Sequence, residues 1–239
     1  MSSVKKRLKH QLMKTVPGQV KRLDQTSRRA QKVYEKVSQV PLLPTRRRYN
    51  LTLSHSQKFI WFRVAKVGTR TILNHLKNSN IPLEVEDVSN VYYPPKLYED
   101  YFKFAFVRNP WDRLVSCWLD KVIKHNMYRF DEQNREKMRE FENFVDYVAG
   151  LDIENCDRHL RLQSRLIDLN HIDYIGRLET FEADLNHVCQ MIGVEENTIT
   201  RKNAAAKRQP YQDYYTEAIQ VKVRQIYQTD IQLFGYQFE

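Results

Sequence analysis

Residues 58–71 read KFIWFRVAKVGTRT, and they join a strand-like segment to a short turn that contains glycine. The first half, 58–64, is rich in aromatic and β-branched side chains and has the length of a buried strand. A short turn over 66–71 follows, and we expect a helix from about Thr71 to Lys77. A strand that passes through a glycine-containing turn into a helix is suited to holding a phosphate group, because backbone N–H groups of the turn and of the helix N-terminus face the anion.

The side chains of the turn suit the same task. Gly68 lets the backbone approach an anion closely, Lys66 and Arg70 add positive charge, and Thr69 and Thr71 add hydroxyl donors. The turn is not a Walker A loop, because its lysine precedes the glycine, and this disfavours an ordinary ATPase or kinase. Taken alone, the turn is equally compatible with a plain strand–turn–helix that carries a surface lysine.

A second strand is expected over 101–107, directly before Arg108. The helix after it is the clearest element of the sequence, because apolar residues recur on one face at helical spacing. These residues are Trp111, Leu114, Val115, Trp118, Leu119, Val122 and Ile123. Asn109 suits the N-cap, Pro110 suits the first helical position, and Asp112 complements the helix dipole.

Two residues of this second segment are candidates for binding an anion. Arg108 stands at the carboxyl end of its strand, where ligands bind in open α/β sheets, and a guanidinium there can grip a phosphate with two hydrogen bonds. Ser116 lies two turns into the helix and can donate its hydroxyl to the same group. The alternative is that Arg108 forms a surface ion pair and that Ser116 only faces the sheet.

Further elements extend outward from these segments. We expect an irregular stretch over 81–95, a charged stretch over 131–140, a helix over 141–148, and a strand over 173–178. A helix over 181–192, capped by Thr180, a basic loop over 200–210 and a last helix from about Thr216 complete the chain. Strands that alternate with helices predict an α/β fold, a three-layer sandwich with a mainly parallel central sheet.

The positive charge of the chain is concentrated in one segment. Of 239 residues with a net charge of +10, residues 1–50 carry 14 Lys or Arg and 2 Asp or Glu, whereas 51–239 carry 25 and 27. The sequence therefore predicts a basic, partly ordered arm over 1–50 and one domain over 51–239. Nucleic acid is a disfavoured partner, because such proteins carry their positive face on the folded module.

Several sequence features bear on location. Cys117, Cys156 and Cys189 are too few and too widely spaced for a disulfide framework, so we expect buried free thiols. Neither a membrane-spanning run nor a secretory leader is found, which predicts a cytoplasmic protein. The basic arm is expected to be a solvated extension, or else to contact a membrane surface, a partner or a polyanion.

The two segments together resemble those of sulfotransferases that use 3′-phosphoadenosine 5′-phosphosulfate (PAPS), particularly the carbohydrate (Golgi-type, family 2) branch. Residues 63–71 are similar to that family's 5′-phosphosulfate loop, and 106–116 to its 3′-phosphate segment. The resemblance continues in 159–163, in 174–179 and in the C-terminal stretch 214–236, so that it covers about 58–238. It implies a fold similar to that of the P-loop NTPases.

The resemblance implies roles for residues of both segments. The 5′-phosphosulfate would lie on the backbone of the loop, with Lys66 stabilising the leaving oxygen, and the 3′-phosphate on Arg108 and Ser116. The further donor-binding residues would be Val67, Gly68, Thr69, Arg70 and Thr71. Arg201 and Lys202, in the late basic loop, would close over the 3′-phosphate. PAPS is then the co-substrate, and no metal is expected.

The general base is not identified by a motif. His159 lies in a family-like segment and is flanked by basic residues, although it could equally be a structural histidine. Related enzymes use a glutamate between the two phosphate segments, which here offers Glu84, Glu86 and Asp87, with Glu86 the second choice. Each of these carboxylates could instead be a solvated surface group.

The expected activity is transfer of a sulfuryl group from PAPS to a carbohydrate hydroxyl of a glycan or glycolipid, by in-line displacement. The main alternative is a non-catalytic protein on a degenerate sulfotransferase fold, which would bind a polyanion or a partner through its arm. A nucleotide kinase is a third interpretation, disfavoured by the missing Walker A loop. The members of the carbohydrate branch in eukaryotes usually carry an N-terminal membrane helix, which this sequence does not show. The expectation is therefore a cytoplasmic enzyme, either free or peripheral to a membrane.

Overall fold

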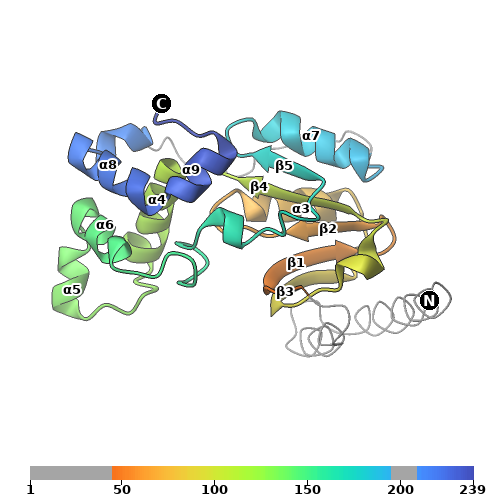
Figure 1. Cartoon of the computed structure of the whole chain (residues 1–239), viewed down its shortest axis with the longest axis horizontal. Coiled ribbons are helices and arrows are strands. Elements are labelled where there is room, and N and C mark those ends of the chain that lie inside the picture. Colours follow the sequence, from red (N-terminus) through yellow and green to blue (C-terminus); the bar gives the residue numbers. More distant parts are fainter. Residues whose placement is uncertain (1–44, 195–208) are drawn as a thin grey trace.

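A computed structural model describes residues 45–194 and 209–239 of the chain. At its centre lies a five-stranded sheet of order β3-β1-β2-β4-β5 (Figure 1). The strands are β1 (Tyr49–Ser54), β2 (Phe59–Phe62), β3 (Val85–Val91), β4 (Phe102–Val107) and β5 (Tyr174–Arg177). The predicted strands over 58–64, 101–107 and 173–178 are confirmed as β2, β4 and β5.

The sheet is mixed in its pairing but nearly uniform in direction. β2, β4 and β5 pair in parallel, whereas β1 is antiparallel to both β2 and β3. Since β1 alone is reversed, the other four strands point the same way, and the expectation of a mainly parallel sheet is confirmed. The carboxyl ends of β2, β4 and β5 therefore meet at one edge, where the segments after β2 and β4 begin.

Two strands were not foreseen. The prediction that 81–95 is irregular is wrong, because β3 occupies Val85–Val91. Its pairing with β1 contains two register shifts, so that its buried residues do not alternate as those of a regular strand would. β1 begins at Tyr49, two residues inside the range assigned to the basic arm.

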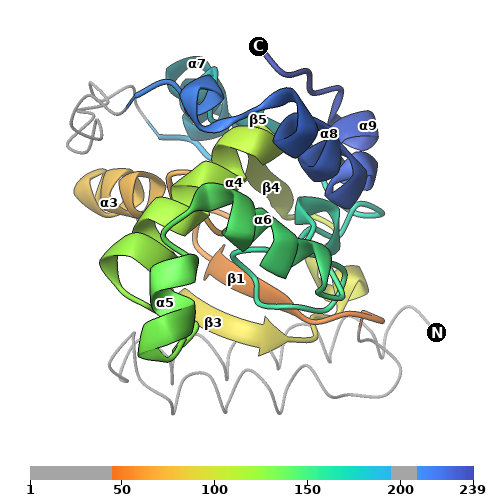
Figure 2. The same cartoon turned by 90° about the vertical axis from the view of Figure 1, so that its left-hand side faces the viewer.

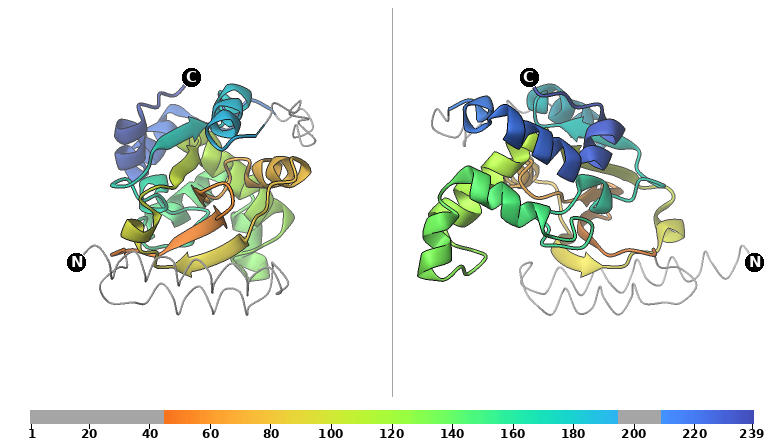
Figure 3. Two further views of the ribbon diagram at one scale, coloured as in Figure 1. Left: turned by 90° about the vertical axis from the view of Figure 1, so that its right-hand side faces the viewer. Right: turned by 60° about the vertical axis from the view of Figure 1, so that its left-hand side comes forward.

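Helices and helical turns surround the sheet. They are α3 (Thr69–Asn78), η1 (Pro95–Tyr98), α4 (Pro110–Trp118), η2 (Leu119–Lys124), α5 (Glu132–Lys137), α6 (Phe141–Ala149), η3 (Gln163–Arg165), α7 (Phe181–Met191), η4 (Tyr211–Tyr214), α8 (Glu217–Ile226) and α9 (Gln228–Phe234). Figure 3 shows α3 and α7 on one side of the sheet and α8 and α9 on the other. α4, α5 and α6 gather at the end of the molecule that faces the viewer in Figure 2.

The core of the sheet is aromatic. Trp61 and Phe104 lie on the paired strands β2 and β4, are fully buried, and stack with ring centroids 6.1 Å apart. Offset stacking of this kind adds to the free energy of apolar burial and holds the two site-bearing strands in register. Cys117 and Cys189 are buried free thiols as expected, whereas Cys156 is only partly buried. In the part of the chain that the structure describes, no helix is both long and apolar enough to cross a membrane.

Candidate functional site

The loop between β2 and α3 has an unusual backbone. Lys66 and Gly68 both have positive φ, of 72° and 79°. A Cβ at Gly68 would lie 3.1 Å from Leu178 Cδ1 and 3.3 Å from the Phe181 ring, so glycine is needed both for its conformation and for its size. The Thr71 amide donates to the Gly68 carbonyl at 2.9 Å, whereas the amides of Thr69 and Arg70 precede this first hydrogen bond of the helix and are the ones an anion at its N-terminus would use.

The side chains of this loop divide into two groups. Arg70 is exposed and Thr71 is half-buried at the start of α3, where both can reach an anion. The Thr69 hydroxyl instead donates to the Val64 carbonyl at 2.9 Å, so its hydrogen is used to close the loop and its oxygen is left as an acceptor. The Val67 side chain is buried, so only its backbone could contact an anion.

Lys66 joins the two predicted anion-binding segments. Its carbonyl accepts a hydrogen bond of 3.1 Å from Arg108 Nη1, and its ammonium lies 2.7 Å from Asp120 Oδ2. The side chain is only 15% exposed. Burial lowers the pKa of Lys66, and the hydrogen bond and charge of Asp120 oppose this effect.

Arg108 stands at the end of β4, as predicted, with its guanidinium 12% exposed. Its Nε donates to Asp112 Oδ2 at 2.7 Å. Asn109 caps α4 by accepting from the Trp111 amide at 3.1 Å, which confirms the predicted helix start. Ser116 is half-buried and follows Asp112 by one turn, so it lies on the same face of α4 as the Arg108–Asp112 pair.

The backbone at Arg108 is held by residues far away in the sequence. Gln163 Oε1 accepts from the Arg108 amide at 2.9 Å, and Gln163 Nε2 donates to the Arg108 carbonyl at 2.8 Å. The fully buried Asp230 in turn accepts from the amides of Gln163 and Ser164, at 2.6 and 3.0 Å. Glu179 Oε1 accepts from the Asn109 amide at 2.6 Å. Gln163, Glu179 and Asp230 lie in the family-like segments. They therefore fix the backbone at Arg108 and Asn109.

Arg113 is a site residue to which the sequence assigned no role. It is buried, and its guanidinium donates to the carbonyls of Ala65, Arg158 and Arg161 at 3.1, 3.0 and 2.9 Å. One side chain of α4 thus holds the start of the phosphate-type loop against the segment that contains His159. The sequence signal that could have identified Arg113 is a charged residue next to the apolar face of a well-capped helix.

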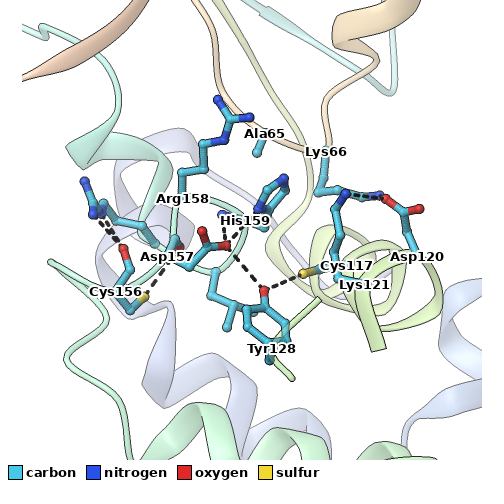
Figure 4. Close-up of polar contacts among 12 residues, drawn as sticks. Ala65, Lys66, Cys117, Asp120, Lys121, Tyr128, Cys156, Asp157, Arg158 and His159 are labelled. Atoms are coloured by element: carbon cyan, nitrogen blue, oxygen red, sulfur yellow. Dashed lines mark hydrogen bonds and ion pairs between the residues drawn. The ribbon is translucent and has the colours of Figure 1, made fainter. Parts of the chain in front are cut away.

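His159 lies beside the loop, with its ring between Asp157 and the Ala65–Lys66 backbone (Figure 4). Its Nδ1 is 2.7 Å from Asp157 Oδ1, which also accepts from the His159 amide at 3.0 Å. Burial alone would raise the pKa of Asp157, but the hydrogen bonds from His159 outweigh it and lower the pKa to about 2. Asp157 is therefore ionised and can only accept, so in the neutral imidazole the proton lies on Nδ1 and the lone pair on Nε2.

The three carboxylates between the phosphate segments have other partners. Glu84 accepts from the His55 amide at 2.9 Å, and Asp87 forms an ion pair with Arg63. Glu86 is buried in an ion pair of 2.6 Å with Lys77. Lys77 stands near the C-terminal end of α3, about 12 Å along the helix axis from the loop. The structure thus brings His159 to the loop, but not Glu86.

Arg201 and Lys202 lie outside the described residues, as does 1–44 of the basic arm. Among the residues that are described, no group of three or more His, Cys, Asp or Glu side chains is placed to hold a metal ion.

Comparison with known proteins gives a family match over nearly all of the described part. The model of the sulfotransferase family matches residues 49–237. Carbohydrate sulfotransferase 10 of Xenopus laevis is 25% identical over 72% of this chain and 57% of the relative. Carbohydrate sulfotransferase 10 of Rattus norvegicus is 30% identical over 59% and 49%.

The chain spans about half the length of these curated relatives. An uncharacterised protein of Archaeoglobus fulgidus is 32% identical over 46% of this chain and 83% of its own length. No solved structure gives a significant match.

Proposed function

Because the chain belongs to the sulfotransferase family, in the carbohydrate branch, we propose that it transfers a sulfuryl group from PAPS to a carbohydrate hydroxyl. The observation that carries this proposal is the hydrogen bond from Arg108 Nη1 to the Lys66 carbonyl, because it joins the two anion-binding segments into one site. A donor that carries phosphate at both its 5′ and 3′ ends needs two such segments side by side.

The two ends of the donor have separate binding groups in this proposal. The 5′-phosphosulfate lies on the amides at the start of α3, with Arg70 and Thr71 beside it. The 3′-phosphate lies against Arg108 and Ser116. Arg108 donates to Asp112 and to the Lys66 carbonyl, which places its guanidinium at the junction of the two segments, and a guanidinium can bind a phosphate with two hydrogen bonds. Arg201 and Lys202 are proposed to close over the 3′-phosphate.

The reaction is an in-line displacement at sulfur. The acceptor hydroxyl oxygen forms a bond to sulfur while the bond from sulfur to the bridging oxygen breaks, and adenosine 3′,5′-bisphosphate leaves. The ammonium of Lys66 donates to the bridging oxygen as negative charge develops there. His159 Nε2 accepts the hydroxyl proton, and Asp157 holds the ring and stabilises the imidazolium that forms.

Three further proposals concern the setting of the reaction. The acceptor is a glycan or glycolipid, as the names of the relatives suggest. The basic residues of 1–50 assist by contact with a polyanion or a membrane surface. The reaction takes place in the cytoplasm or at its membrane boundary. Each of these is independent of the donor site.

The competing function is binding without catalysis. A protein that only bound polyanions through its arm would not need a lysine at the mouth of a phosphate loop together with a histidine oriented by an ionised aspartate. The His159–Asp157 pair therefore favours the enzyme, since an imidazole that a carboxylate orients through Nδ1 is suited to taking a proton on Nε2.

The test uses the full chain with PAPS labelled in its sulfuryl group and a panel of glycan, glycolipid and phenolic acceptors. We expect transfer of label to a carbohydrate, and a loss of about 100-fold or more in Lys66→Ala and Arg108→Ala. Asp146→Asn, which breaks an exposed ion pair with Lys222, is the matched control and should behave as wild type. Absence of donor binding, or donor binding without transfer to any acceptor, would refute the proposed transfer and favour the binding protein.

A further inference from the structure

Asp120 contacts the Lys66 ammonium, and no part of the mechanism above uses it. It belongs to η2, a π-helical turn over Leu119–Lys124 that continues α4. Such turns are rare and occur frequently at functional sites, because the extra residue rotates the side chains that follow. Here the turn directs the Asp120 carboxylate at the loop between β2 and α3, where Oδ2 lies 2.7 Å from Lys66 Nζ (Figure 4).

Several basic side chains lie close to the Asp120 carboxylate. Besides Lys66, Lys121 Nζ lies 3.2 Å from Oδ2, and His125 Nε2 lies 3.6 Å from Oδ1. Burial alone would raise the pKa of Asp120, but the hydrogen bonds and charges of Lys66 and Lys121 outweigh it and lower the pKa to about 2. The carboxylate is therefore charged at neutral pH.

Lys66 needs such a partner because its surroundings disfavour its charge. Its side chain is largely buried, and the groups that face it are Asp120 and Lys121 from η2, Cys117 from α4, and Arg108 through the Lys66 carbonyl. Burial raises the pKa of the Cys117 thiol to about 11, so this thiol is neutral. Among the described groups around Lys66, Asp120 is then the ionised acid.

We propose that Asp120 is a positioning residue for the reaction, which keeps the Lys66 ammonium charged and directed at the mouth of the loop while the donor binds and reacts. This inference rests on the proposed function. An ammonium has three N–H groups, so a bond to Asp120 leaves two for the oxygens of the phosphosulfate. The left-handed backbone at Lys66 and the π-helical turn at Asp120 are two local irregularities that meet in one ion pair.

The first test needs no donor and no activity. Protein labelled with ¹³C-lysine is titrated by NMR, and the Lys66 Cε signal is assigned through its absence in Lys66→Arg. In Asp120→Asn, Lys66 should lose its proton at a lower pH than in the wild type, because the charge that opposes burial is gone. Asp146→Asn, in which an exposed Lys–Asp pair is broken, should leave the Lys66 titration unchanged. An unchanged titration in Asp120→Asn would overturn the proposal.

The second test separates positioning from folding and from donor binding. Asp120→Asn should lower kcat about 10-fold to 100-fold while the dissociation constant of the donor stays equal or falls, since a negative charge is removed from an anion site. The alkaline decline of kcat should also move to lower pH. Asp120→Glu restores the charge but displaces it, so it should recover the wild-type pH profile and only part of kcat.

The outcomes distinguish the role of Asp120 from the proposed sulfuryl transfer. If Lys66→Ala loses activity but Asp120→Asn keeps both the kcat and the pH profile of the wild type, the role of Asp120 is refuted and the proposed function stands. If the wild type transfers no sulfuryl group, or Lys66→Ala is as active as the wild type, the proposed function fails, and with it the role of Asp120.

Discussion

The two proposed anion-binding segments are built in opposite ways. The loop after β2 depends on its own backbone, with left-handed residues at Lys66 and Gly68 and a hydrogen bond from Thr69 to Val64. The junction after β4 has an ordinary backbone and is held from outside, by Gln163 on both sides of Arg108 and by Glu179 on Asn109. The first segment is thus sensitive to local substitutions, whereas the second is sensitive to changes far away in the sequence.

The largest effect should come from adding a side chain in the loop. Gly68→Val places a branched Cβ close to Leu178 and Phe181 at a φ of 79°, so the loop must change its path. We expect a loss of donor affinity of about 100-fold or more, measured by calorimetric titration with adenosine 3′,5′-bisphosphate. Gly150→Val is the control, because a Cβ there meets nothing closer than 3.5 Å. If Gly68→Val bound the donor normally, the loop would not be the 5′ site.

At the junction after β4, the matching experiment replaces a residue that contacts no ligand. Asp230→Ala leaves the buried amides of Gln163 and Ser164 without their acceptor, so it should lower the free energy of unfolding by about 2–5 kcal/mol. Urea denaturation measures this change. Because Gln163 positions Arg108, the affinity for the 3′-phosphate should fall as well. A stable Asp230→Ala protein with normal affinity would show that the support of Arg108 is dispensable.

A third substitution acts between the two segments. Asp157→Asn can no longer fix the proton on His159 Nδ1, so Nε2 is not reliably free to take the acceptor proton. We expect kcat to fall about 10-fold to 100-fold with unchanged donor affinity. Single-turnover kinetics with saturating PAPS measures the step. Equal kcat in Asp157→Asn and in the wild type would exclude His159 as the oriented base.

The pH dependence should report on Lys66. Its ammonium must be protonated to donate to the leaving oxygen, and burial lowers its pKa. Activity should therefore be lost, as pH rises, earlier than an ordinary lysine would allow. A pH profile of kcat/KM for PAPS, which reports groups of the free enzyme, measures this decline with a hydroxyl acceptor. Activity that persisted undiminished to the pH range of a free lysine would contradict the role of Lys66 as the donor of this proton.

The smallest effect should come from Glu86→Gln. The Glu86 carboxylate pairs with Lys77 near the far end of α3, so activity should stay within about 3-fold of the wild type and only stability should fall slightly. Initial rates at saturating PAPS decide this point. A loss of activity as large as that of His159→Ala would identify Glu86 as the general base.

What could be predicted from the sequence was local. The cap at Asn109, the turn around Gly68 and the strand before each of them are encoded by neighbouring residues, and the structure places them as expected. β3 was missed because its register shifts break the alternation of buried residues, and because Glu86 is buried through a partner on another element.

The missed parts of the site depend on distant contacts. The roles of Gln163 and Asp230 follow from hydrogen bonds between residues 55 or more positions apart, which no local pattern shows. Arg113 is comparable, since its three carbonyl partners come from two other segments. Asp120 looked like one polar residue of a regular helix, and the π-helical turn that directs it at Lys66 has no sequence signature.

The central claim is that the Lys66 loop and Arg108 form one site for a donor with two charged ends. Calorimetric titration of the wild type and of Arg108→Ala with PAPS and with adenosine 5′-phosphosulfate, which lacks the 3′-phosphate, tests it most directly. The wild type should prefer PAPS about 100-fold, and Arg108→Ala should lose that preference while its weak binding of adenosine 5′-phosphosulfate is retained. A wild type without the preference, or an Arg108→Ala variant that keeps it, would contradict the claim.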